Sequence, residues 1–283
     1  MNTVPAESKE VKPKRRWLSV LALFVAAFID SSENDSLSIL WPSMYPSLKM
    51  SEGQLGPVLG ISGLLTTFML PIWGYASDRF SRRILLIFIT GIWGAWTMSI
   101  AFVHSFSQLM LVRILSSLGL GVLWPAAFSL LSDLFSSKER GKAAGIMTAV
   151  SYFGTLAAYG VLPVLAATSP EGWRLGFIIM GAASVLTGLL MLVIYEPVRG
   201  AAEPELSDIL KEENNGRFAF RFSDLPDLMK IRSWWVMVGH SAIDAIAMSI
   251  LYGWVFTWLD GLGYAESAFL VVMLLAVATM IGH

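Results

Sequence analysis

The sequence has no cysteine and few charged residues, and each shortage narrows the kind of protein it encodes. Without cysteine there are no disulfides, thiolate metal sites or cysteine nucleophiles. Charged residues make up 14% of the chain, against about 25% in an ordinary soluble domain. A net charge of -1 supplies no basic field for nucleic acid. No nucleophile–base pair, metal cluster or phosphate-binding loop stands out, so we expect neither an enzyme nor a bound metal or cofactor.

Long apolar runs take the place of the missing charge. Hydrophobic residues make up 55% of the chain, and its mean hydropathy is +0.63. A bilayer core needs about 20 apolar residues per helix, and an open sheet would leave its backbone unpaired in lipid. The sequence therefore predicts an all-α polytopic membrane protein with eight spans, at residues 17–41, 54–75, 84–103, 106–131, 143–167, 175–195, 233–259 and 264–282.

Basic residues fall on alternate sides of these spans. Every second loop holds few basic residues, namely Lys49 and Arg174. The tail and the remaining loops hold the others, at residues 1–16, 79–83, 138–142 and 196–232. The positive-inside rule then places the N-terminus and these loops in the cytoplasm. We expect an integral protein of the plasma or inner membrane.

The polar stretch 196–232 divides the chain into parts. A cytoplasmic tail (1–16) and a six-helix bundle (17–195) come before it, and two further helices (233–283) follow. We expect the stretch to be a cytoplasmic loop with one short helix near 204–214. A helical bundle followed by a long loop and a second set of membrane spans is typical of a duplicated architecture.

The loop between the second and third spans reads GYASDRFSRR over residues 74–83. Gly74 would let two helices approach closely, and Asp78 would favour the positive end of a helix dipole. We expect the arginines of this loop to pair with Asp133 and Glu139 in the next cytoplasmic loop. The pattern resembles the signature loop of the major facilitator superfamily, the alternative being an ordinary basic loop that anchors two helices.

Three further segments are similar to that superfamily: Arg113 with Gly119 and Gly121, Asp133-Leu134-Phe135 followed by Arg140, and Gly172-Trp173-Arg174. Asp30 and Glu196-Pro197-Val198-Arg199-Gly200 resemble its spinster-type branch. The resemblance implies two six-helix halves, of which this chain holds the first and two helices of the second, cut near Gly282. It also implies a conformational role for Gly74, Asp78, Arg79, Arg82, Arg83, Asp133, Glu139 and Arg140.

Ionisable residues inside the spans are functional candidates, because charge in a bilayer is costly. Asp30, Glu33 and Asn34 share one face of the first span at helical spacing. At about 1.5 Å per residue, Asp30 and Arg113 lie at similar depth. The resemblance places helices one, four and seven around a central cavity, where we expect Arg113 to pair with Asp30 or Glu33 in a proton or substrate pathway. A structural ion pair, or acids in the outer headgroup region, is the alternative.

The seventh span carries His240 and Asp244, four residues apart and therefore on one face. Asp244 falls about 16 Å into the span, near the middle of the membrane. A histidine–aspartate pair can titrate near neutral pH, so the two are further candidates for the proton or substrate pathway. His240 serving only to pack the bundle is the alternative, and without a third ligand we expect no zinc site.

Three functions fit these features. The first is a secondary active transporter that moves a small organic solute by alternating access around a midplane site, coupled to protons. The second is an uncoupled facilitator, and the third is a membrane sensor or scaffold that does not transport. In each case we expect the bilayer and a small molecule as partners, no nucleic acid, and a monomer.

Overall fold

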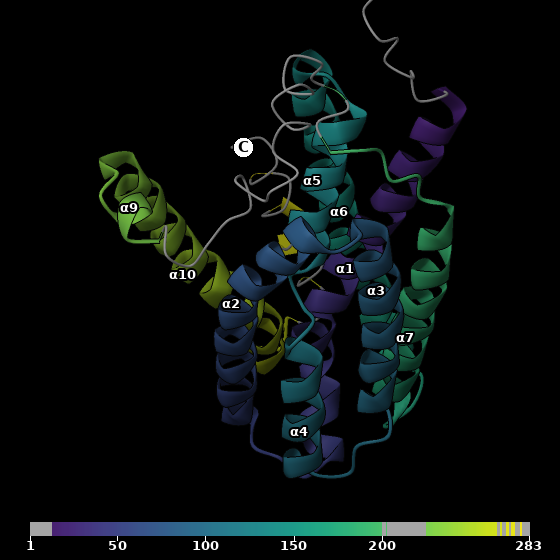
Figure 1. Cartoon of the computed structure of the whole chain (residues 1–283). Helices are drawn as coiled ribbons and strands as arrows, with labels where there is room; N and C mark the ends of the chain where they lie inside the picture. Colours follow the sequence, from purple (N-terminus) through teal and green to yellow (C-terminus); the bar gives the residue numbers. More distant parts are fainter. Residues whose placement is uncertain are drawn as a thin grey trace, which may run out of the picture.

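The computed structural model describes residues 13–199, 202 and 225–264, with residues 267, 270, 271, 273, 274 and 278 beyond them. Every regular element in these ranges is a helix, and no strand occurs among them (Figure 1). The elements are α1 (Pro13–Ser47), η1 (Glu52–Gln54), α2 (Leu55–Arg79), α3 (Arg82–Ile100), α4 (Phe106–Ser117), α5 (Leu123–Leu134), α6 (Ser137–Ala166), α7 (Gly172–Leu190), η2 (Met191–Val193), α9 (Leu225–Met229) and α10 (Arg232–Gly261). The helix expected near 204–214 and most of the run 264–282 lie outside the described residues.

Four helical stretches are long and apolar enough to cross a bilayer: Glu52–Arg79, α3, α6 and Gly172–Val193. α1 has the length, with 35 residues, but carries three carboxylates in its middle. Large apolar side chains such as Phe68 on α2 and Phe88 on α3 are exposed on the outside of the bundle. A surface of this kind suits lipid rather than water, and the protein is an integral membrane protein.

The run 106–131, expected to be one helix, is broken. α4 ends at Ser117 and α5 begins at Leu123. Gly121 between them has a φ of +88°, a left-handed conformation that glycine adopts readily and an α-helix does not contain. The single-helix prediction was wrong because apolar composition does not report the direction of the backbone.

Two tryptophans satisfy carbonyls that the break frees. Trp73 on α2 donates its indole N–H to the Leu118 carbonyl at 2.8 Å, and Trp93 on α3 donates to the Ser116 carbonyl. Gly119 lies directly against the Trp93 ring, where a side chain would not fit. Because an unpaired carbonyl in lipid costs several kcal/mol, these bonds stabilise the broken segment inside the membrane.

Glycines let α3 and α7 pack closely. A Cβ added at Gly181 would lie 2.5 Å from the Gly94 carbonyl oxygen, and one at Gly188 would meet the backbone of Gly91. Small-residue contacts of this kind are usual between membrane helices. Gly74 was predicted to serve the same purpose and does not, because no described atom lies within 4 Å of the place its Cβ would take.

α1 carries a polar segment between two apolar clusters. Leu23 belongs to one buried cluster, and Leu37 and Trp41 belong to the other. Asp30 and Glu33 lie in the part of α1 between them. The fold therefore holds its membrane-embedded carboxylates at intermediate depth, with apolar packing on either side.

The two ends of the bundle differ in charge. We call one end the basic end; it holds Arg16 at the start of α1, Arg82 at the start of α3 and Lys138 at the start of α6. The other end, which we call the opposite end, holds Lys49 and Arg174. Figure 1 shows the start of α1 and the α5–α6 connection at the upper end, and the start of α4 at the lower end.

Candidate functional site

A cavity of about 510 Å³ lies among α1, α2, α4, α6 and α10. Its polar lining includes Asn34 and Asp35 from α1, Ser62 from α2 and Thr155 from α6. Arg113 from α4 supplies the positive charge. A cavity of several hundred Å³ with a few convergent polar groups is the usual form of a small-molecule site.

Arg113 is buried but not fully hydrogen-bonded. Arg113 is 5% exposed, and its Nε has no hydrogen-bond partner. Among the described residues no ion pair within 4 Å joins it to Asp30 or Glu33, although its charge interacts with that of Glu33 over a longer distance. The predicted direct pairing is absent because Glu33 instead accepts a hydrogen bond from the Thr97 hydroxyl. A buried guanidinium with an unused donor is available to an anion.

The carboxylates of α1 divide between two cavities. Asp30 and Glu33 line a separate chamber of about 30 Å³, which has room for about one water molecule. Asn34 and Asp35 line the large cavity, where the Thr155 hydroxyl donates to Asp35 at 3.1 Å. The face predicted from helical spacing is therefore split between the two cavities, and Asp35 lines the larger one.

Helix α10 contributes less than the sequence predicted. His240 is exposed on α10 and lines none of the cavities found among the described residues. The side chain of Asp244 lies outside the described part. α10 reaches the large cavity through Gly253, further along the helix. The start of α10, which carries His240, leans away from the bundle in the described part of the chain (Figure 1), so a role for His240 in the pathway stays a prediction.

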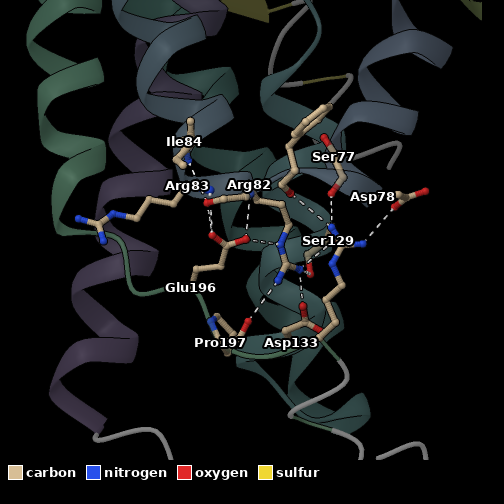
Figure 2. Close-up of polar contacts among 12 residues, drawn as sticks. Ser77, Asp78, Arg82, Arg83, Ile84, Ser129, Asp133, Glu196 and Pro197 are labelled. Carbon is tan, nitrogen blue, oxygen red and sulfur yellow. Dashed lines mark hydrogen bonds and ion pairs between the residues drawn. The ribbon is translucent and has the colours of Figure 1, made fainter. Parts of the chain in front are cut away.

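A network of ion pairs closes the basic end around Arg82 (Figure 2). The guanidinium is 1% exposed and pairs with Asp133 at the end of α5, as the sequence predicted. It also donates to the Ser129 hydroxyl at 3.1 Å, to the Pro197 carbonyl at 3.3 Å and to Glu196 at 3.2 Å. Each nitrogen of the guanidinium has a partner, so the buried charge is compensated.

Glu196 is a member of this network that the sequence prediction did not include. Its carboxylate accepts from the Ser81 hydroxyl at 2.5 Å and from the backbone N–H groups of Arg82 and Arg83 at 2.8 and 3.4 Å. Burial raises the pKa of Glu196, but these hydrogen bonds outweigh burial and leave the pKa below its ordinary value. The carboxylate also lies at the N-terminus of α3, where the helix dipole favours negative charge.

Asp78, predicted to favour the positive end of a helix dipole, forms an ion pair of 3.8 Å with Arg199 in the described part of the chain. Arg199 also donates to the Ser77 carbonyl at 2.5 Å. Ser81 caps α3 by accepting from the Ile84 N–H. Ser81 and Glu196 therefore satisfy the first backbone N–H groups of α3.

The remaining signature residues pair locally. The Arg79 guanidinium lies 4.5 Å from the centre of the Tyr75 ring, and Arg83 donates to the Leu192 carbonyl at 2.5 Å. Glu139 does not pair with the loop arginines as predicted but lies 3.7 Å from Arg16 of α1. Arg140, expected to belong to the same network, lies beside Glu139 in the first turn of α6.

Comparison with known proteins identifies the relationship. A family model described as the Major Facilitator Superfamily matches residues 23–283. The chain is 27% identical over 259 residues to the "Probable L-galactonate transporter" of Escherichia coli K12, and 26% identical over 178 residues to the 4-hydroxybenzoate transporter PcaK of Pseudomonas putida. The alignments cover 89% and 63% of this chain, but 54% and 39% of the relatives, so the chain spans about half the length of the first.

The fold is similar to that of a solved transporter. A bacterial homologue of the human lysosomal transporter Spinster, in an inward-facing and unoccupied conformation, superposes with a TM-score of 0.72. The match covers 92% of this chain and 59% of that protein, at 22% sequence identity. The likeness establishes the arrangement of the helices.

Proposed function

The chain belongs to the major facilitator superfamily, and from this we propose that it acts in a proton-coupled secondary transporter of small organic anions. The observation that carries the substrate class is Arg113, buried beside a cavity of about 510 Å³ with its Nε unpartnered. A guanidinium binds carboxylates in a bidentate geometry. The names of both relatives, for L-galactonate and 4-hydroxybenzoate, describe transporters of carboxylates.

In alternating access, the two halves of such a transporter move so that the central cavity opens to one side of the membrane at a time. In this proposal the bundle of residues 17–195 and the helices of 233–283 move relative to each other around the cavity, as in other transporters built from repeats. The contacts of Arg82 with Asp133 and Glu196 tie α3 to α5 and to the segment after α7. These contacts keep the first bundle rigid while it moves.

Proton coupling is assigned to the carboxylates of α1. Ionisable residues inside a span are typical of proton relays, and Asp30 and Glu33 lie beside the cavity that contains Arg113. A proton on either carboxylate changes the negative charge near Arg113, and therefore changes its affinity for an anion. Binding of the proton and of the anion are then thermodynamically linked.

Uptake by the full-length protein in liposomes tests this function. We expect an inward proton gradient to drive uptake of labelled hydroxylated or aromatic carboxylates, and a protonophore to abolish the accumulation. Arg113→Gln should weaken uptake roughly 10- to 100-fold, because a hydrogen bond to a charged group contributes about 1.5–3 kcal/mol. Arg174→Lys, an arginine change at the opposite end, is the matched control and should leave the apparent affinity unchanged.

Two results would favour the other functions. Uptake that ignores the proton gradient and survives Asp30→Asn indicates an uncoupled facilitator. Carboxylate binding without flux indicates a sensor. An Arg113→Gln protein that kept the parent's full preference for carboxylates over neutral analogues would contradict the anion assignment.

A further inference from the structure

Leu120 stands between the two cavities of the bundle. It is part of the non-helical segment 118–122 that joins α4 to α5. Leu120 lines the large cavity together with Arg113, and it lines the small chamber together with Asp30 and Glu33. A single apolar residue therefore contributes to the walls of both spaces.

The segment around Leu120 is held by two backbone turn hydrogen bonds, from Leu118 N–H and Gly119 N–H, and by side-chain contacts. Trp73 of α2 binds the Leu118 carbonyl, and Thr66 of α2 donates to the Ser117 carbonyl at 3.4 Å. Gly121 has the positive φ that turns the chain here. Because its anchors lie on α2 and α3, a shift of either helix also moves Leu120, whereas an unbroken helix would resist such a local change.

The chamber behind Leu120 is small, and it places two carboxylates among mainly apolar walls. Its volume of about 30 Å³ excludes an organic solute, and it contains space for about one water. Glu33 is held by the hydroxyl of Thr97 on α3, with Ser184 of α7 on the same wall. The charged groups that act on the pair are the two carboxylates themselves and, more distantly, Arg113 of α4.

We propose that Leu120 is a gate residue, and that the segment 118–122 separates a proton chamber at Asp30 and Glu33 from the solute cavity at Arg113. The proposal rests on the proton coupling proposed above. While Leu120 is in place, the two carboxylates exchange no protons with the solute cavity. A shift of α2 or α3 during alternating access withdraws the side chain and joins the two spaces, so proton exchange is confined to one stage of the cycle.

Carboxyl labelling of the full-length protein in detergent tests the gate without any solute. A water-soluble carbodiimide is applied at fixed pH, and mass spectrometry compares three carboxylates of one helix: Asp30 and Glu33 in the chamber, and Asp35 in the large cavity. In the parent protein we expect Asp35 to react several-fold faster than the other two. Leu120→Ala should raise the rates of Asp30 and Glu33 several-fold and leave the rate of Asp35 unchanged.

Matched leucine changes separate the gate from general loosening. Leu59 lines the large cavity alone, and Leu123 lines the small chamber alone. Neither Leu59→Ala nor Leu123→Ala should therefore join the two spaces. Leu120→Met should react like the parent, and Leu120→Val replaces the alanine variant if that one does not fold.

The gate is overturned if Asp30 and Glu33 react as fast as Asp35 in the parent. It is also overturned if Leu120→Ala leaves their rates unchanged, or if Leu59→Ala raises them equally. Because labelling needs no transport, its result is independent of whether carboxylates are carried. Failure of uptake would contradict the proposed function, but the labelling rates would still test whether Leu120 separates the two spaces.

Discussion

Arg82 and Arg113 are both buried arginines, yet their surroundings differ. Every nitrogen of the Arg82 guanidinium has a hydrogen-bond partner. The partners are Glu196, Asp133 and the Pro197 carbonyl. Arg113 has an unpartnered Nε beside a cavity. Burying a charge without compensation costs several kcal/mol, so a bundle keeps such a group only where something else binds it. This contrast supports the proposal that Arg113 binds a ligand, whereas the partners of Arg82 all belong to the protein.

Glu196 makes the stability of the basic end depend on pH. Its hydrogen bonds hold the pKa below the ordinary value of 4.5. A lowered pKa stabilises the folded state above the ordinary value, and that contribution is lost as the pH falls through the folded-state pKa. We expect the thermal stability of the protein in detergent to fall as the pH drops below about 4.5, and Glu196→Gln to weaken this dependence.

A graded control accompanies the pH series. Ser81→Ala removes one of the hydrogen bonds that lower the pKa of Glu196, so it should weaken the pH dependence less than Glu196→Gln does. Melting temperatures measured at each pH by intrinsic tryptophan fluorescence report the effect. Equal slopes for the parent and Glu196→Gln would show that the carboxylate does not carry the dependence.

One long-range pairing could be predicted from the sequence because two loops stand at the same end of the bundle. The pairing of Arg82 with Asp133 was predicted from the signature loop and the next cytoplasmic loop, and the structure contains it. The sequence indicated Glu196 only as part of the spinster-type pattern, and no partner was predicted for it. Its position directly after an apolar run is the one further signal. Its partner Arg82 is 114 positions away in the chain, and no spacing rule reports a contact at that separation.

The packing of α3 on α7 depends on glycines at the contact. A Cβ at Gly181 would meet the Gly94 carbonyl oxygen at 2.5 Å and the Met98 backbone nitrogen at 2.6 Å. Backbone atoms cannot move aside as a flexible side chain does, so Gly181→Ala should lower the free energy of unfolding by about 1–3 kcal/mol. Chemical unfolding in mixed micelles measures this loss.

Gly60 on α2 is the matched control for this contact. No described atom lies within 4 Å of the place where its Cβ would stand. Alanine is favoured over glycine inside a helix by roughly 0.5–1 kcal/mol, so Gly60→Ala should keep or raise the stability. A loss at Gly60 as large as that at Gly181 would mean that helix propensity or the detergent, rather than the contact, governs the result.

Hydropathy located the helices but not their continuity. The apolar runs correspond to α1, α2, α3, α6, α7 and α10 in the described part of the chain. The run 106–131 has uniform apolar character, and only the φ of Gly121 and the packing of Gly119 on Trp93 reveal its break. Both glycines were noted as features of the superfamily, but neither one by itself indicates a positive φ. The division of Asp30 and Asp35 between two cavities follows from the same break.

The whole bundle is asymmetric along its length. Apolar clusters lie toward both ends, polar groups of α1 and α4 lie between them, and basic side chains gather at one end. The ion pair of Arg16 with Glu139 holds the starts of α1 and α6 together at the basic end. His104 and Arg174 lie at the opposite end, 3.5 Å apart. The positive-inside rule predicts that the basic end faces the cytoplasm.

Single-cysteine labelling tests this orientation directly, because the parent sequence has no cysteine. His104 and Lys138 are both exposed and stand at opposite ends of the bundle. In intact cells we expect a membrane-impermeant maleimide to label His104→Cys and to label Lys138→Cys only after the membrane is opened. The cysteine-free parent supplies the background. Labelling of both positions from one side would contradict a membrane-crossing bundle, and labelling of Lys138→Cys alone in intact cells would reverse the orientation.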